Sequence, residues 1–364
     1  MYKMLIVMFF ASVLLSCTQK EENKSYPFYI GTYTDGESQG IYHTILHQDG
    51  SFDSLQLAAK SSNPSFLSFA HGKKVLVAVN EVDIDGVGTV ESYHIGKNKL
   101  ILVDSVSSGG AHPCHININA DGDIAVANYT GGNVGLTRVA KDGQLSSLLD
   151  VAQHSGQSLT ERQTKPHAHS AWFTSEGQEL IAVDLGVDQL IFYRVENDQL
   201  VRTDSLCVEA GAGPRHLAFH PTQSILYSVN ELNSTISVIS KEDQNKWELV
   251  NSISTLPDDF KGKSFCADIH ISPDGRFLYA SNRGHNSLVV YRIDDSGKKV
   301  LPIAYELVKG EWPRNFSLTS DGEFLIVANQ HSNNLVSFKR DKSTGLLSYL
   351  NEVKADKPVC ILFE

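Results

Sequence analysis

Histidine, arginine and acidic residues recur in two short stretches of a pattern that repeats along the chain. The first stretch surrounds a proline or alanine at the start of an apolar segment, and it contains His112, His115, His167, His169, Arg215, His216, Asp268, His270 and Arg314. The second stretch follows a later apolar segment, and it contains Glu81, Asn128, Asp184, Glu231, Arg283, His285 and His331. Imidazole and carboxylate groups can transfer protons, and guanidinium groups can stabilise negative charge. If the fold brings the two stretches together, these residues form a candidate site.

Several of these residues also have a purely structural interpretation. His167 and His169 are two residues apart, so on a strand both would point to one face and could share a ligand or metal, or one could bond a loop carbonyl. Arg215 follows a Gly-Ala-Gly-Pro loop that directs it inward, although an arginine tying neighbouring repeats together would have the same setting. Glu231 could be a general base or an ion-pair partner of Arg215 or Arg283.

The repeat itself determines the fold class. Its copies are marked by Pro64, Pro113, Pro166, Pro214, Ala267 and Pro313, which are 49, 53, 48, 53 and 46 residues apart. Within each copy a strand, a turn commonly of the Asp-Gly type, an apolar strand, a polar loop and two further strands follow one another. Such a period is typical of four-stranded propeller blades, which must pack around an axis to bury both faces.

A seventh copy begins at Lys357 but contains only one strand, 357–363. The segments 28–33 and 40–45 match the second and third strands of the repeat, so both ends of the chain are expected to share the last blade. We therefore predict an all-β, seven-bladed β-propeller with four-stranded antiparallel blades, closed by the C-terminal strand joining the N-terminal strands. In such blades the start of the first strand and the end of the second lie at the same mouth of the channel, which gathers the candidate residues there.

The N-terminus predicts export. Lys3 precedes an apolar run, 4–15, that is too short to span a bilayer and ends in Ser16-Cys17. This pattern resembles a bacterial lipoprotein signal, which predicts a signal peptide at 1–17 with lipidated Cys17, a polar tether at 18–25 and a folded domain at 26–364. We expect a periplasmic or cell-surface lipoprotein of a Gram-negative bacterium, held to the membrane through Cys17. A plain secretory signal is the alternative, and without any signal the chain would be cytoplasmic.

Charge and cysteine usage restrict the partners. The formal net charge is −11 and no basic run is present, so nucleic acid is not expected to be a partner. No Cys/His metal spacing and no calcium loop occurs, and no cofactor is expected. Three of the four later cysteines lie in apolar repeat segments and are expected to be buried free thiols; the four are Cys114, Cys207, Cys266 and Cys360.

Several motifs together resemble those of the seven-bladed β-propeller lactonase family, which includes bacterial propeller-type 6-phosphogluconolactonases and carboxymuconate lactonizing enzyme. The resemblance covers essentially the whole chain after the tether. The motifs are Tyr29-Ile-Gly-Thr-Tyr-Thr34, Gly213-Pro-Arg-His216, Asn230-Glu231, Ser272-Pro-Asp-Gly-Arg276 with Ala280-Ser-Asn-Arg-Gly284, and Trp312-Pro-Arg-Asn-Phe316.

The resemblance implies a lactone hydrolase of the 6-phosphogluconolactonase type, with His167, Arg215, Glu231 and Arg283 as catalytic residues. His167 or Glu231 would handle the proton, while the two arginines would hold the oxyanion and an anionic group of the substrate. No Gly-x-Ser-x-Gly elbow is present, which favours direct attack by water. The expected substrate-binding residues are His115, His169, His216, Asp268 and Arg314.

Three alternatives stay open. Because phosphogluconolactone belongs to cytoplasmic sugar metabolism, an exported enzyme could act on a different sugar lactone or carboxylated lactone. The same mouth could serve a propeller that binds a ligand without turnover. A metal-assisted hydrolase could use His167 and His169 with Glu231 or Asp184.

Overall fold

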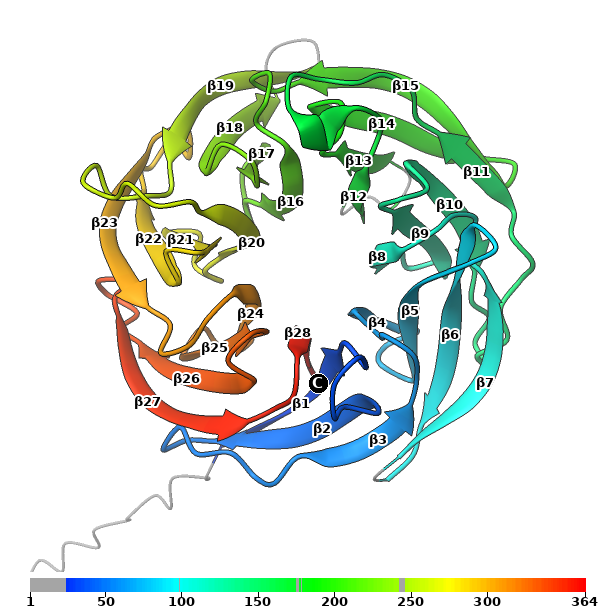
Figure 1. The fold of residues 1–364 in the computed structure, drawn as a ribbon, viewed down its shortest axis with the longest axis horizontal. Helices are drawn as coiled ribbons and strands as arrows, with labels where there is room; N and C mark the ends of the chain where they lie inside the picture. The colour runs from blue at the N-terminus through cyan, green and yellow to red at the C-terminus, as the bar shows by residue number, and fades with distance from the viewer. Residues whose placement is uncertain (1–23, 98, 175–176, 178, 242–245) are drawn as a thin grey trace, which may run out of the picture.

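The structure, a computed structural model, describes residues 24–97, 99–174, 177, 179–241 and 246–364. Seven antiparallel sheets of four strands are arranged around a central axis (Figure 1). The only helical element in these described ranges is one 3₁₀ turn, η1 (Glu161–Gln163). The predicted seven-bladed β-propeller is therefore confirmed.

We number the blades in the order in which their innermost strands occur in the chain. Blades 1 to 3 are β4 (Phe66–Ala70), β5 (Val75–Ile84), β6 (Val87–Ile95), β7 (Leu100–Ser107); β8 (Pro113–Ile118), β9 (Asp123–Asn128), β10 (Asn133–Arg138), β11 (Asp150–Gln153); and β12 (Ala168–Phe173), β13 (Glu179–Asp184), β14 (Gln189–Glu196), β15 (Gln199–Cys207). Blades 4 to 6 are β16 (Pro214–Phe219), β17 (Ile225–Asn230), β18 (Thr235–Lys241), β19 (Trp247–Ser254); β20 (Phe265–Ile271), β21 (Phe277–Arg283), β22 (Ser287–Ile293), β23 (Val300–Leu307); and β24 (Pro313–Leu318), β25 (Phe324–Asn329), β26 (Asn334–Arg340), β27 (Leu347–Lys354). Blade 7 is β28 (Pro358–Phe363), β1 (Ser25–Thr32), β2 (Gly40–His47) and β3 (Gln56–Lys60).

The second strand of most blades is buried along its whole length because neighbouring blades cover both of its faces. In β25, for example, all six residues are buried. The apolar clusters accordingly join adjacent blades, as where Tyr227 and Val229 of blade 4 pack with Leu278 and Tyr291 of blade 5. Each Å² of apolar surface removed from water stabilises a fold by roughly 25 cal/mol. The apolar contacts between neighbouring blades therefore hold the ring together.

Blade 7 is completed by both ends of the described chain, as predicted. β28 pairs antiparallel with β1, placing Phe28 opposite Phe363 and Ile30 opposite Ile361. In Figure 1 the red C-terminal strand lies beside the blue N-terminal strands within one blade. A Cβ atom at Gly31 would lie 2.3 Å from the carbonyl oxygen of Pro64, so only glycine permits this approach to blade 1. β1 begins at Ser25, one residue before the expected start of the folded domain.

Three of the four cysteines after Cys17 are buried free thiols, as expected, and Cys207 is exposed. No helix in the described part of the chain has the length and apolar character needed to cross a membrane. The predicted signal peptide and Cys17 lie outside the described residues, so their assignment stays a prediction.

Candidate active site

A bulge near the start of the innermost strand aims one side chain of each of several blades into the channel. The pairing register between first and second strands shifts at this point in blades 2 to 6. A bulge leaves an extra residue unpaired and re-aims its side chain. The residues skipped by the pairing are Cys114, His169, Arg215, Ala267 with Asp268, and Arg314. The repeated backbone feature thus explains why chemically active side chains recur at one position of the sequence repeat.

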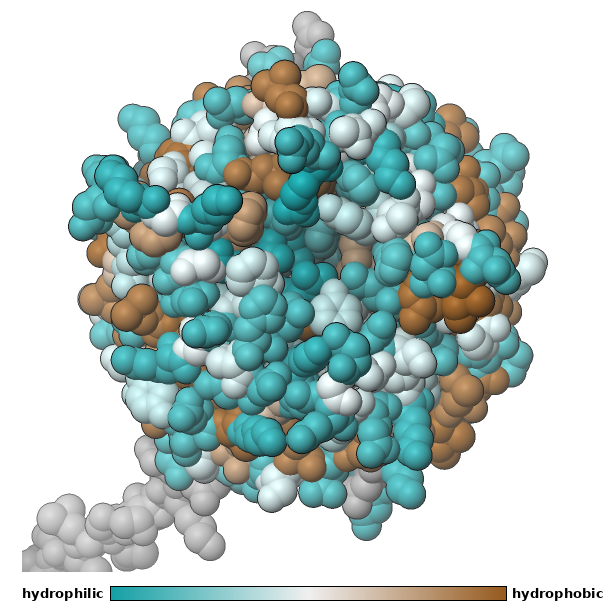
Figure 2. All heavy atoms as spheres, in the orientation of Figure 1, coloured by the Kyte–Doolittle hydropathy of each residue, from teal (hydrophilic) through white to brown (hydrophobic). Residues whose placement is uncertain are grey.

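These side chains border a cavity of about 210 Å³. Its lining comes from strands or strand ends of all seven blades and from the loop between β11 and β12: Tyr33, Glu81, Cys114, Tyr129, Arg162, His169, Glu231, Arg283 and Arg314. In the space-filling view the ring is hollowed at its centre, and hydrophilic residues surround the hollow (Figure 2). The starts of the first strands and the ends of the second strands therefore lie at the same mouth of the channel, as predicted.

Glu231 is the centre of an ion-pair network in this cavity. Its Oε2 lies 3.0 Å from Arg215 Nε and 2.7 Å from Arg283 Nη2, while its Oε1 lies 2.6 Å from Arg162 Nη1. Burial alone would raise the pKa of this carboxyl group, but the three guanidinium groups lower it to about 2. Glu231 is therefore an ionised anchor for arginines and a weak proton acceptor at neutral pH.

Arg215 and Arg283 are fixed by further acceptors. Arg215 Nη1 donates to the carbonyl oxygen of Ala267, and Arg283 Nη2 donates to that of Cys266 at 2.9 Å. The guanidinium of Arg283 also stacks over the ring of Trp312, 5.2 Å from its centroid. Burial, followed by the repulsion of nearby arginines, lowers the pKa of Arg215 to about 10, so it stays charged at neutral pH.

A second ion pair crosses the cavity. Arg314 Nη2 lies 3.8 Å from Glu81 Oε2, and its guanidinium carbon lies 5.2 Å from the centroid of the Tyr33 ring. The hydroxyl of Tyr33 donates to the same Glu81 oxygen at 2.9 Å. Among the described residues, the four guanidinium groups of Arg162, Arg215, Arg283 and Arg314 form ion pairs only with the two carboxylates of Glu81 and Glu231, which leaves an excess of two positive charges. The cavity suits an anionic ligand, or a reaction that develops negative charge.

His169 supplies a neutral imidazole to the cavity wall. Its Nδ1 lies 3.9 Å from the thiol sulfur of Cys114, and no hydrogen bond to its Nε2 occurs among the described residues. Burial and then the nearby Arg215 and His216 hold the pKa of His169 well below its usual value. The ring is therefore unprotonated at neutral pH, with a nitrogen free to accept a proton.

His167 lies on the other side of Tyr129. Its ring stacks on the Tyr129 ring at 4.4 Å, and its Nδ1 lies 2.9 Å from the Tyr129 carbonyl oxygen. The lining of the cavity does not include it. Of the two interpretations that the sequence left open for His167 and His169, this arrangement matches the one in which a histidine bonds a loop carbonyl. Asp184 is engaged elsewhere, with Oδ2 2.6 Å from the buried His154 Nδ1. In the described residues no group of three His, Cys, Asp or Glu side chains is arranged to hold a metal ion.

Three predicted substrate-binding residues lie one level deeper in the channel, below the arginines. The His115 ring is held between Phe66 and Trp172, at 4.3 and 4.4 Å, which indicates a packing role. His216 and Asp268 form a buried pair, with His216 Nδ1 2.8 Å from Asp268 Oδ1. Between this level and the cavity is a chamber of about 10 Å³, room for one water molecule.

Sequence analysis missed Arg162, Tyr33 and Tyr129. Arg162 lies in η1, within the long loop from β11 to β12, and it bridges Glu231 and the Tyr129 hydroxyl, 2.9 Å from Nη2. The long spacing of 53 residues between Pro113 and Pro166 was the available signal for this loop. Tyr33 lies within the motif Tyr29–Thr34 and Tyr129 directly follows Asn128, but neither residue was singled out as part of the site.

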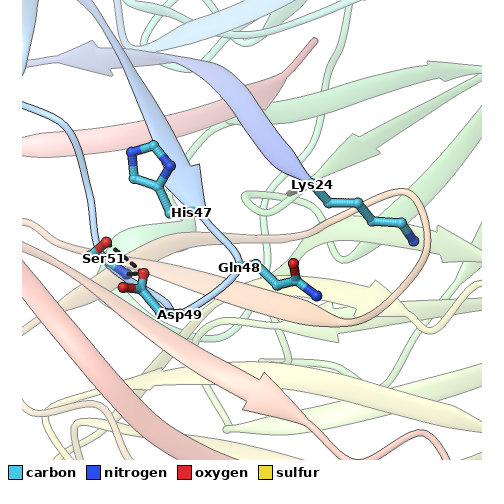
Figure 3. Close-up of a pocket in the computed structure, with 5 residues that line it drawn as sticks. All are labelled: Lys24, His47, Gln48, Asp49 and Ser51. Atoms are coloured by element: carbon cyan, nitrogen blue, oxygen red, sulfur yellow. Dashed lines mark hydrogen bonds between the residues drawn. The ribbon is translucent and has the colours of Figure 1, made fainter. Parts of the chain in front are cut away.

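A larger hollow, of about 470 Å³, lies at the outer rim beside the start of β1 and the turn after β2. Figure 3 shows that its polar side chains do not converge on one point. Asp49 Oδ1 already accepts hydrogen bonds from the Ser51 nitrogen and hydroxyl. This rim hollow therefore lacks the concentration of charge found in the channel.

A propeller channel lined by arginines, carboxylates and a neutral imidazole defines the site of a hydrolase or anion-binding protein. The family model for the lactonase, 7-bladed beta-propeller, matches residues 27–363. This chain belongs to that family, as its sequence motifs suggested.

Individual relatives agree with this assignment. The chain is similar to 6-phosphogluconolactonase of Bacillus subtilis, with 36% identity over 92% of this chain and 97% of that protein. It is also similar to 6-phosphogluconolactonase of Formosa agariphila, with 34% identity over 88% and 94%. Among solved structures, the periplasmic gluconolactonase PpgL of Pseudomonas aeruginosa has a TM-score of 0.88 and 31% identity over 93% of this chain and 99% of its own.

Proposed function

We propose that this protein hydrolyses a sugar lactone to the corresponding hydroxy acid. The observation that carries the proposal is the excess of positive charge around a cavity that also holds the neutral imidazole of His169. Lactone opening creates negative charge on the carbonyl oxygen and requires a proton acceptor for the attacking water. Family membership and the relatives named as lactonases support the same reaction.

In the proposed mechanism the substrate carbonyl oxygen faces Arg283 and Arg314, which line the cavity. Water attacks the carbonyl carbon while His169 Nε2 accepts one of its protons. When the bond from the carbonyl carbon to the ring oxygen breaks, the imidazolium donates that proton to the ring oxygen. Glu231 holds Arg215 and Arg283 in place, and His167 orients Tyr129.

The charge of the cavity also bears on the choice of lactone. Arg162 is the most exposed of its arginines, with 44% of its side chain accessible, and its one carboxylate partner among the described residues, Glu231, is shared with Arg215 and Arg283. An anionic substituent on the sugar would find an unneutralised cation there. We therefore propose 6-phosphogluconolactone as a better substrate than unphosphorylated gluconolactone.

The decisive assay compares hydrolysis of these two lactones by the full chain, with spontaneous opening subtracted and with or without a chelator. We expect chelator-insensitive turnover and a higher kcat/KM for the phosphorylated substrate. Equal rates on both would contradict the role of the extra positive charge. No rate above background on either would leave a propeller that binds a ligand without turnover.

We also propose that the protein is exported and lipid-anchored at Cys17. The signal-like residues 1–17 support this, as does the periplasmic location of the related PpgL. Metabolic labelling with a fatty-acid analogue should mark the wild-type chain and leave Cys17→Ser unlabelled. An unlabelled wild-type chain retained in the cytoplasm would overturn the assignment.

A further inference from the structure

Arg215 is surrounded by hydrogen-bond acceptors, and one of them is a histidine nitrogen. Its Nε donates to Glu231 Oε2 at 3.0 Å, and its Nη1 donates to the Ala267 carbonyl oxygen and to His216 Nε2 at 3.4 Å. Only 2% of the arginine is exposed, and the chamber beside it has room for no more than one water molecule, so its protein partners largely determine its position. A guanidinium carries donors alone, and therefore His216 Nε2 must be unprotonated to face it.

The opposite nitrogen of His216 faces a carboxylate that accepts on both sides. Asp268 Oδ1 lies 2.8 Å from His216 Nδ1 and accepts from the Ile269 nitrogen at 3.0 Å. Its Oδ2 lies 3.0 Å from His270 Nε2 and accepts from Asn315 Nδ2 at 2.5 Å and the Phe316 nitrogen at 3.3 Å. Because amide donors occupy both oxygens, this group must be an ionised carboxylate, and the proton of neutral His216 must lie on Nδ1.

We propose that Asp268 and His216 are positioning residues that fix the Arg215–Glu231–Arg283 network by holding His216 in its Nδ1–H tautomer. Arg215 and Arg283 share one oxygen of Glu231, and Arg283 lines the cavity, so a displaced Arg215 would shift the group that faces the substrate. This inference rests on the proposed lactone hydrolysis. It assigns to His216 and Asp268 a role that does not require contact with the substrate.

The surroundings of His216 oppose its protonation. The His115 and His169 rings lie 5.4 and 5.3 Å from it, and Phe66 and Trp172 cover it at 5.8 and 6.1 Å. Burial, followed by the repulsion of Arg215, lowers the pKa of His216 to about 4, although Asp268 acts in the other direction. His270, which is partly exposed, contacts Asp268 and not the imidazole. The neutral tautomer thus persists at neutral pH.

Asp268→Asn tests the arrangement directly. A carboxamide has one donor end, and either orientation places it against a donor: the Ile269 nitrogen on one side, or Asn315 and the Phe316 nitrogen on the other. We expect the donor end to lie toward His216, because it meets one amide donor on that side and two on the other. The His216 ring must then carry its proton on Nε2, which faces Arg215. We expect kcat to fall about 10- to 100-fold, as for other residues that orient an active-site group.

His216→Gln and His216→Leu form the matched pair. A glutamine carbonyl can accept from Arg215 while its NH₂ donates to Asp268, so His216→Gln should keep kcat within a few-fold of wild type. His216→Leu provides no acceptor and should show the loss expected for Asp268→Asn. Equal activity of the two folded variants would overturn the proposal. This pair also decides the matter if Asp268→Asn fails to fold.

A spectroscopic readout separates this inference from the proposed function. ¹⁵N chemical shifts of labelled histidine distinguish the two neutral tautomers without any substrate. We expect the Nδ1–H form for His216 in the wild type at neutral pH, and the Nε2–H form in Asp268→Asn. An Nε2–H wild type would refute the positioning role, whereas a wild type without lactonase activity would refute the proposed function alone.

Discussion

Glu231→Gln is expected to lower the free energy of unfolding by about 3–5 kcal/mol, because removing one partner of a buried ion pair leaves the other charge uncompensated. Arg215 and Arg283 are 2% and 4% exposed and have no other carboxylate within ion-pair distance among the described residues. Glutamine preserves the shape of the side chain, so the effect reports charge. Lactonase activity should fall as well, since both arginines would lose their carboxylate anchor.

Denaturant unfolding of the variant measures this effect, and Glu37→Gln is the control. Glu37 pairs with Lys354 at 3.4 Å on the surface, with 81% and 76% of the side chains exposed. An exposed pair contributes less than about 1 kcal/mol. A Glu231→Gln protein as stable as the Glu37→Gln control would show that the network contributes little to stability.

The same carboxylate makes stability depend on pH. Its pKa is about 2 in the folded protein and has an ordinary value of 4.5, so the folded state favours the ionised form. That stabilisation is complete above pH 4.5 and is lost as the pH falls toward 2. The glutamine variant lacks this contribution, so the difference in stability between the two proteins should shrink over that interval.

His169→Gln is expected to reduce kcat by about 10²–10⁴-fold, the usual contribution of a general base. KM should change little, because the arginines that hold the substrate remain. The pKa of His169 lies well below its usual value, so loss of wild-type activity through its protonation should begin only at acidic pH, and the variant should lack that acid limb.

His167→Gln is the matched control for this prediction. The two histidines lie two residues apart, His167 just before β12 and His169 within it, but only His169 lines the cavity. We expect His167→Gln to retain most of the wild-type kcat, with any change arising through Tyr129. Loss of activity in His167→Gln with a normal His169→Gln enzyme would return the base to the residue that the family motif favours.

The fold could be predicted from the sequence because every blade requires the same kinds of residue at the same places, so these residues recur with the period of the blades. Proline or alanine at the start of each first strand and apolar second strands recur in the order in which strands pair in space. The incomplete last copy likewise indicated that β28 joins β1. These features are local, and each follows from chain geometry.

The sequence was sufficient to predict which residues gather at the mouth of the channel, but not which of them contact one another. Sequence order placed Arg215, Glu231 and Arg283 together, and the structure joins them in one network. It could not separate His167 from His169, because the bulge between Ala168 and Ser170 breaks the simple alternation of side chains along the strand. Arg162 reaches the cavity from an irregular loop, whose path no periodicity encodes.

The bulges at the inner strand starts also separate the positions that face the channel from the positions that form the apolar blade cores. Each places a side chain in the channel without altering the apolar second strand behind it, so residues can be exchanged one blade at a time while the blade cores stay intact. Ser65 and Val359, at the inner strands of blades 1 and 7, are small side chains that border the chamber below the cavity together with Cys114. A larger side chain at either position would fill this chamber and narrow the channel beneath the cavity, while the second strands behind it stay unchanged.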